Sequence, residues 1–308
     1  MFASFAAGTL LALAAAQQII IPIQKTPRQI DRPVAAIKTA GPAFAAACKD
    51  LDEWNAPAPP VRIHANTYLV GTCGISAILI TGTDGHILID SGTELGAELI
   101  AANIERLGFR LRDVKNLLHS HEHLDHVGGM ARLQQMTGAQ LVASSAAAPV
   151  FATGKAGRGD PQAGMHKPFA TARVGRVIAG GETVRLGNLM LTAIATPGHT
   201  PGALSWHWGS CDGGVCRRIV YADSLTPISR DDYRFSDHPE YVAAFRDGLQ
   251  RLAAVDCDIL LTPHPSASDM LNRMAGKAPL DDRDACRAYA AELGARLDER
   301  LAKETAAK

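Results

Sequence analysis

The chain has 308 residues, of which 47% are hydrophobic, and its 31 Lys and Arg residues balance 31 Asp and Glu residues. Zero formal net charge and an aromatic fraction of 5% argue against the basic surface and base-stacking platforms of nucleic-acid-binding proteins. The balanced charge also argues against a polybasic membrane patch. The apolar content is ample for a core, and the length fits one large domain or two ordinary ones.

Residues 1–16 are small and apolar, and they predict a secretory signal peptide rather than a core helix. Ala14-Ala15-Ala16 offers a cleavage site before Gln17, although no Lys or Arg precedes Lys25 to form the usual basic start. At about sixteen residues the segment is too short to span a membrane. Seven prolines are then spread over residues 17–60, which predicts an irregular N-terminal arm.

A run of strands is predicted next, followed by a helix and one more strand. Thr83-Asp84-Gly85 is typical of a hairpin turn, and Thr93 is placed to cap a helix that runs to Gly108. The expected strands are 61–63, 67–70, 76–81, 86–90 and 114–118.

A second, similar series follows, which predicts two halves that each combine a sheet with helices. Residues 154–168 are rich in Gly, Pro and charge, as in a mobile loop that covers a site. The expected strands are 140–144, 173–178, 182–186, 189–195, 204–208, 219–222 and 259–261, and the expected helices are 130–136, 239–252 and 286–301. We expect one α/β domain over residues 61–308, a four-layer αββα sandwich with sheet packed on sheet and helices outside.

The six cysteines favour an oxidising compartment. Cys211 and Cys216 bracket a turn-rich loop that a disulfide would close. Cys257 and Cys286 lie near a strand and the C-terminal helix, and Cys48 and Cys73 remain as a third pair. Six cysteines allow fifteen connectivities, so this pairing rests on proximity alone and other pairings stay open.

The segment His119–His126 holds four of the eleven histidines, together with Asp125. It follows the apolar strand 114–118, at a position where α/β proteins place their chemistry. Two further apolar strands also end in histidine, at His199 within Thr196–Gly202 and at His264. Imidazole and carboxylate are the ligands of divalent transition metals, so these strand ends predict a metal site.

The spacing favours two metals side by side. The expected ligands are His121, His123 and His199 for one metal, and Asp125, His126 and His264 for the other. Nitrogen and oxygen ligands without thiolate suit Zn²⁺, although Fe or Mn would also fit. Three protein ligands per zinc leave room for water, whose pKa zinc lowers to near 7, so metal-assisted hydrolysis is the expected chemistry. His119 and Glu122 are treated as neighbours rather than ligands.

The pattern His-x-His-x-Asp-His followed by Gly128-Gly129 resembles the metallo-β-lactamase superfamily, and the resemblance extends from about Ala65 to His264. Finer features are similar to subclass B3. The segments that carry this similarity are Asn66–Gly71, Ser120–His126, Thr196–Gly202 with Ser205-Trp206, and Tyr221–Leu225. The resemblance implies the αββα fold, two Zn²⁺ ions and hydrolysis of the β-lactam amide bond of penicillins, cephalosporins and carbapenems by a metal-bound hydroxide.

The resemblance also implies roles for individual residues. Asp125 would ligate one zinc and orient the hydroxide, and Ser224 and Thr226 would contact the substrate carboxylate. The partner would be a small β-lactam, with no nucleic acid and no stable membrane association. The leader and cysteines fit a periplasmic enzyme. The oligomeric state and the preferred antibiotic stay open.

Other functions remain in competition. A glyoxalase II-like thioesterase or a related lactonase would need a metal-bridging aspartate after the third histidine, and Asp223 lies close to that place. A shift of one residue in strand register decides whether Asp223 enters the site. A structural zinc protein is disfavoured because such sites are normally closed and rich in cysteine. A nuclease is disfavoured by the neutral charge.

Overall fold

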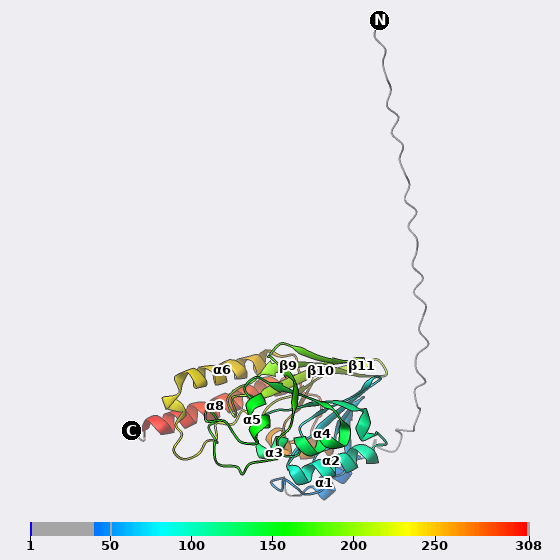
Figure 1. Ribbon diagram of the computed structural model, residues 1–308, viewed down its shortest axis with the longest axis horizontal. Helices are drawn as coiled ribbons and strands as arrows, with labels where there is room; N and C mark the ends of the chain where they lie inside the picture. The colour runs from blue at the N-terminus through cyan, green and yellow to red at the C-terminus, as the bar shows by residue number, and fades with distance from the viewer. Residues whose placement is uncertain (2–39, 50, 307–308) are drawn as a thin grey trace. The chain divides into compact units, whose positions relative to one another are not determined.

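The computed structural model describes residue 1, residues 40–49 and residues 51–306 of the chain (Figure 1). The predicted signal peptide and the first part of the arm lie outside the described residues. From residue 40 onward, the described residues belong to one compact unit.

Two β-sheets form the centre of this unit. The first has the order β1-β2-β3-β4-β5-β6-β7 and the second β12-β11-β10-β9-β8. The strands are β1 (Val61–His64), β2 (Thr67–Leu69), β3 (Ile78–Gly82), β4 (Gly85–Ile89), β5 (Val114–Leu118), β6 (Gln140–Ser144), β7 (Val174–Ile178), β8 (Thr183–Leu186), β9 (Leu189–Ala195), β10 (Leu204–Asp212), β11 (Val215–Tyr221) and β12 (Ile259–Leu261).

Helices cover the outer face of each sheet (Figure 1). The α-helices are α1 (Ala40–Ala47), α2 (Glu94–Arg106), α3 (Leu124–Val127), α4 (Met130–Thr137), α5 (Ala148–Thr153), α6 (Pro239–Ala254), α7 (Met270–Met274) and α8 (Ala285–Ala306). Alternation along the strands explains the layers, since successive side chains point to opposite faces. In β11, Ile219 and Tyr221 enter the core between the sheets, whereas Val220 packs on the side of α6 and α8. The expected αββα sandwich is confirmed.

The structure corrects two local predictions. The irregular arm expected over 17–60 is wrong for Ala40–Ala47, which is helical. Pro42 was counted as a breaker, but proline is tolerated in the first turn of a helix. The strands predicted at 204–208 and 219–222 are parts of a longer hairpin, β10–β11, in which Cys211 and Cys216 are directly opposite.

Five strand ends meet at one edge of the sandwich. β4 and β5 are parallel neighbours in the first sheet, and β11 and β12 are parallel neighbours in the second. β9 runs in the same direction as β11, because both are antiparallel to β10. The segments after β5, β9 and β12 carry the predicted histidines, so the sheet topology brings them together.

Three disulfides join the cysteines in the pairs that proximity favoured: Cys48–Cys73, Cys211–Cys216 and Cys257–Cys286.

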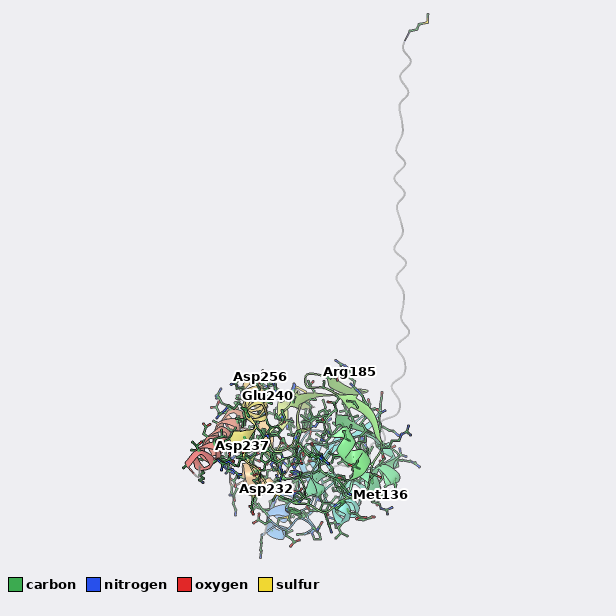
Figure 2. All side chains as sticks on the ribbon, turned by 60° about the vertical axis from the view of Figure 1, so that its left-hand side comes forward. Met136, Arg185, Asp232, Asp237, Glu240 and Asp256 are labelled. Atoms are coloured by element: carbon green, nitrogen blue, oxygen red, sulfur yellow. A yellow bond between two sulfur atoms is a disulfide. The ribbon has the colours of Figure 1, made fainter. Side chains whose placement is uncertain are left out.

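The surface carries charged side chains, among them the exposed acidic residues Asp237, Glu240 and Asp256 around α6 (Figure 2). Within the described ranges, no helix combines the length and apolar character that a membrane span requires.

The disulfides should differ in their contribution to stability. Loop-closure entropy predicts a loss of about 3.5 kcal/mol when Cys257–Cys286 (separation 29) is replaced by alanines, and about 2 kcal/mol for Cys211–Cys216 (separation 5). Urea unfolding of the two double variants measures both free energies of unfolding. A larger loss from the hairpin disulfide would contradict this expectation.

Candidate metal centre

Asp125, His126 and His264 converge on one point. His126 Nε2 lies 3.0 Å from Asp125 Oδ2 and 3.2 Å from His264 Nε2, and the last two atoms are 3.4 Å apart. Zinc with ligand bonds of about 2.0–2.1 Å in a tetrahedron would separate its ligands by about 3.3 Å. The three atoms therefore have the spacing of one face of a zinc coordination tetrahedron.

A second group lies beside the first. His121, His123 and His199 have ligand atoms within 4.8 Å of one another, and so do His121, Asp125 and His126. His121 belongs to both of these groups, so the two predicted ligand sets are adjacent. The six side chains come from the loops after β5, β9 and β12, as the strand-end pattern predicted.

An unpaired buried atom supports metal binding. His121 is fully buried, and its Nε2 has no hydrogen-bond partner among the described residues. Leaving such an atom unpaired costs about 1–3 kcal/mol. Burial, and next the neighbouring imidazoles, hold the pKa of His121 well below its usual 6.5, so its ring is neutral. The atom is therefore a lone pair aimed at the group, and the donor set fits zinc.

The opposite ring nitrogens lie near oxygen atoms that set the tautomers. Three of these oxygens belong to carboxylates: Asp223 Oδ1 lies 2.8 Å from His121 Nδ1, Asp160 Oδ2 lies 3.0 Å from His123 Nε2, and Asp90 Oδ2 lies 3.6 Å from His126 Nδ1. Two are backbone carbonyl oxygens: Thr226 O lies 3.0 Å from His199 Nδ1, and Gly74 O lies 3.3 Å from His264 Nδ1. The distance of 3.6 Å between His126 Nδ1 and Asp90 Oδ2 is that of an ion-pair contact and is too long for a hydrogen bond. Acceptors of this kind orient imidazole ligands and raise their basicity.

Asp125 and His126 form an ion pair within their group. Burial lowers the pKa of His126, but the carboxylates of Asp125 and Asp90 outweigh it and raise the value to about 10. Burial likewise raises the pKa of Asp125, but His126 and His264 hold it well below its usual range. Asp125 is therefore ionised, and it supplies the negative charge of its group.

The position of Asp223 decides an open question from the sequence. Its Oδ1 accepts from His121 Nδ1, the nitrogen opposite the one that faces the metal group. Asp223 is not in either cluster of ligand atoms. It is fully buried, and burial raises its pKa well above the usual value. Asp223 thus contacts the candidate ligand His121 from the outer side, and it lies in neither candidate metal group.

Ser224 and Thr226 follow Asp223 at the end of β11. Ser224 Oγ is buried without a hydrogen-bond partner among the described residues. Thr226 Oγ1 lies 2.9 Å from His199 Nδ1, in addition to the carbonyl contact. The sequence pattern did not predict this orienting role for Thr226.

His119 and Glu122 support the site without joining either ligand group. His119 Nε2 accepts from the Ser144 backbone N–H at 3.2 Å, and burial lowers the pKa of His119 to about 4. Glu122 accepts from Thr200 Oγ1 at 2.6 Å and from the Gly202 N–H at 2.8 Å. Glu122 therefore ties the first histidine loop to the His199 turn.

The loop 154–168 covers the site, as its composition suggested, but its contact residues were not predicted. Besides Asp160, the buried Gln162 places its Nε2 3.3 Å from His199 Nε2. The His166 ring lies 5.1 Å from the His123 ring and 6.5 Å from Trp54. A loop has no periodicity that would mark such residues in advance.

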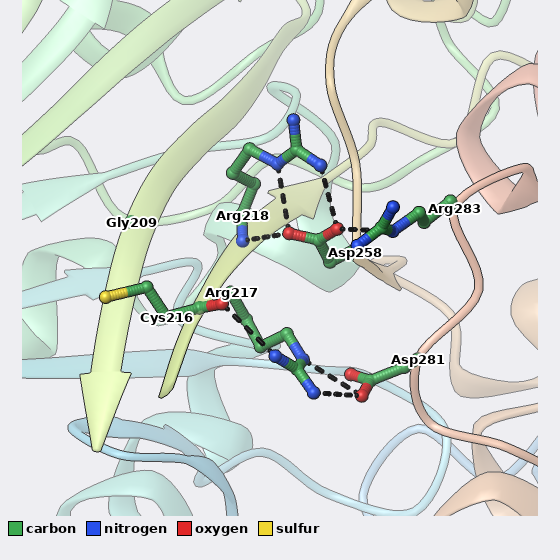
Figure 3. Close-up of a pocket in the computed structure, with 7 residues that line it drawn as sticks. All are labelled: Gly209, Cys216, Arg217, Arg218, Asp258, Asp281 and Arg283. Carbon is green, nitrogen blue, oxygen red and sulfur yellow. Dashed lines mark hydrogen bonds and ion pairs between the residues drawn. The ribbon is translucent and has the colours of Figure 1, made fainter. Parts of the chain in front are cut away.

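A separate hollow of about 410 Å³ lies near the other ends of β11 and β12 (Figure 3). Its arginines are paired with carboxylates: Arg217 with Asp281 at 2.7 Å, and Arg218 with Asp258 at 2.9 Å. No histidine lines it. The hollow is a set of surface ion pairs rather than a second metal site.

Replacing Asp223 by asparagine should weaken zinc binding. The substitution replaces the carboxyl oxygen that accepts from His121 Nδ1 by an amide oxygen, and loss of such a partner typically lowers metal affinity about 10- to 100-fold. Competition with a chromogenic chelator measures the affinity, with Asp256→Asn, an exposed carboxylate, as the matched control. Unchanged affinity would remove the orienting role, and loss of one whole metal equivalent would make Asp223 a ligand.

Several solved structures are similar to this chain over nearly their whole length. MIM-2 metallo-β-lactamase is 57% identical, with a TM-score of 0.83, over 86% of this chain and 98% of that one. MIM-1 from Novosphingobium pentaromativorans is 51% identical, with a TM-score of 0.84, over 85% and 98%. MEM-A1, a subclass B3 metallo-β-lactamase from a soil metagenome library, is 43% identical, with a TM-score of 0.79, over 83% and 100%.

Curated relatives match over shorter stretches. A hydroxyacylglutathione hydrolase from Hyphomonas neptunium is 27% identical over 41% of this chain, and one from Anaeromyxobacter dehalogenans is 28% identical over 53%. The alignments span only 40% and 58% of those two proteins. The model of the metallo-beta-lactamase superfamily matches residues 70–264. The chain therefore belongs to the metallo-β-lactamase superfamily and, within it, is most like the subclass B3 enzymes.

Proposed function

We propose that this protein hydrolyses the amide bond of β-lactam antibiotics, namely penicillins, cephalosporins and carbapenems, with two zinc ions. The observation that carries the proposal is the pair of adjacent ligand groups without cysteine. Support comes from identity of 43–57% to metallo-β-lactamases over almost their full length.

The six ligand residues divide the metal binding between them: His121, His123 and His199 hold one ion, and Asp125, His126 and His264 hold the other. Zinc bound there would lower the pKa of water to about 7 and supply hydroxide at neutral pH. Asp125 uses Oδ2 toward His126 and His264, which leaves Oδ1 to accept a hydrogen bond from the attacking water.

Two hydroxyls at the end of β11 bind the carboxylate that β-lactams carry. Ser224 Oγ is buried and unpaired within the described structure, so an anionic acceptor would satisfy it. Thr226 Oγ1 lies beside His199 and presents a second hydroxyl. On the other side, Gln162 and the rest of the loop 154–168 exclude bulk water from His123 and His199.

A glutathione thioesterase is the less supported alternative. It would need Asp223 between the metals, whereas Asp223 is hydrogen-bonded to the far side of the His121 ring. The hydroxyacylglutathione hydrolases also match over no more than 58% of their length.

The three disulfides support folding in an oxidising compartment. Together with the apolar residues 1–16, they lead us to propose export to the periplasm through a cleaved signal peptide.

Removal of metal should abolish turnover. The protein is incubated with a carbapenem, a cephalosporin and S-lactoylglutathione, with and without a chelator, and hydrolysis is followed by absorbance. We expect β-lactam turnover that the chelator abolishes and added zinc restores, because the nucleophile depends on the metal. Chelator-sensitive turnover of the thioester alone would overturn the proposal in favour of the alternative.

Replacing Ser224 by alanine should raise KM for a cephalosporin about three- to tenfold with kcat within about twofold, as expected for the loss of one hydrogen bond to bound substrate. Metal content should be unchanged because Ser224 is outside both ligand groups. Steady-state kinetics and metal analysis provide the measurements. An unchanged KM would remove Ser224 from the substrate site.

A further inference from the structure

The segment that follows β11, residues 223–236, carries both proposed substrate-binding hydroxyls. Between them, Leu225 is fully buried and has a φ of 48°, in the left-handed region that side chains other than glycine rarely adopt. A residue persists in that region only where surrounding contacts hold it. The contacts that hold this segment therefore determine where the two hydroxyls point.

The first contact comes from α8. Tyr289 is buried, and its hydroxyl lies 3.2 Å from the Asp223 carbonyl oxygen and 3.0 Å from the Ser224 carbonyl oxygen. The phenol donates to these two acceptors, which immediately precede Leu225. One turn earlier in α8, the Cys257–Cys286 disulfide joins the helix to the residues before β12. Tyr289 thus anchors the start of the segment to a fixed helix.

The second contact comes from the last turns of the same helix. The buried Glu304 carboxylate accepts from the backbone N–H of Phe235 at 3.1 Å and of Ser236 at 2.7 Å, and also from Arg300 Nε at 2.6 Å. Arg300 in turn donates to the Tyr233 carbonyl at 3.1 Å. One helix therefore holds both ends of the segment.

The middle of the segment reaches the loop on the other side of the site. The Arg230 backbone N–H donates to the Pro161 carbonyl at 3.0 Å, and its guanidinium donates to the Asp160 carbonyl at 3.2 Å. The Asp160 carboxylate lies 3.0 Å from His123 Nε2. The position of the segment is thus coupled to the loop that covers the metal groups.

We propose that α8 is part of the substrate-binding apparatus, in which Tyr289 and Glu304 act as positioning residues at the two ends of the segment 223–236. Neither residue belongs to the ligand groups. Loss of either anchor lets the Ser224 and Thr226 hydroxyls move, whereas the six proposed ligand residues lie outside the segment, on the loops after β5, β9 and β12. The expected rise in KM rests on the proposed β-lactamase function, whereas the expected rise in hydrogen exchange of the segment does not.

The test uses two replacements that preserve shape, Tyr289→Phe and Glu304→Gln, in the full chain. Tyr68→Phe is the matched control for the tyrosine, because Tyr68 is also buried but packs beside Phe109 on the helix-covered face of the first sheet. Glu299→Gln is the control for the glutamate, because Glu299 is exposed on the same helix. The readouts are kcat and KM for a cephalosporin, metal content, the melting temperature, and hydrogen–deuterium exchange of the metal-free protein.

For each variant we expect KM to rise about three- to tenfold, the range of one lost hydrogen bond, with kcat and metal content as in the unmodified protein and both controls. Amides of residues 223–236 should exchange faster in the variants, with little change elsewhere. Unchanged KM and unchanged exchange would overturn the proposal, as would a loss of kcat and metal together. If Tyr289→Phe unfolds the chain, the KM and exchange of the Glu304→Gln variant decide whether the proposal holds. If the unmodified protein has no β-lactamase activity, the proposed function fails, and the exchange experiment still tests the anchoring.

Discussion

The carboxylate of Asp90 is the contact on which the rest of the site depends. It accepts from the Ser120 backbone N–H and hydroxyl and from the Tyr221 hydroxyl, each at 2.7 Å, and it lies 3.6 Å from His126 Nδ1. Asp90 is buried, with a φ of 66°, and aspartate is among the few residues that tolerate that conformation. Because a buried carboxylate without donors costs several kcal/mol, the donors that satisfy it must all be in place.

These donors come from both sheets, so the fold and the metal centre depend on the same contacts. Ser120 precedes the first ligand, and Tyr221 ends β11. Further bonds join the sheets at this edge, from the Leu204 N–H to the Ser120 carbonyl at 2.7 Å and from the Trp206 indole to the His119 carbonyl at 2.8 Å. The proposed ligands therefore rest on an edge that hydrogen bonds from both sheets hold in place.

The flanking segments bear on which reaction the proposed metal centre favours. Asp223 holds a ligand from outside, whereas a carboxylate in the metal groups would favour other chemistry. Ser224 and Thr226 then lie on a segment that a single helix, α8, holds at both ends. The proposed metal ligands come from strand ends, whereas the proposed substrate contacts depend on elements that are distant in the sequence.

The sequence alone was sufficient to predict the αββα layers, and the structure brings together the six residues that it proposed as ligands. Strand periodicity and the histidines that end apolar strands are local features, and parallel strand ends meet at one edge. Local patterns could not predict α1, because Pro42 occupies the tolerated first turn of a helix. They could not identify Asp160 or Gln162 as neighbours of the histidines, because the residues of a loop show no regular hydrophobic period. Only the tertiary structure decided which nitrogen of each histidine has an oxygen partner and that Asp223 lies beside His121, because both depend on strand register and on oxygen atoms supplied from elsewhere in the fold.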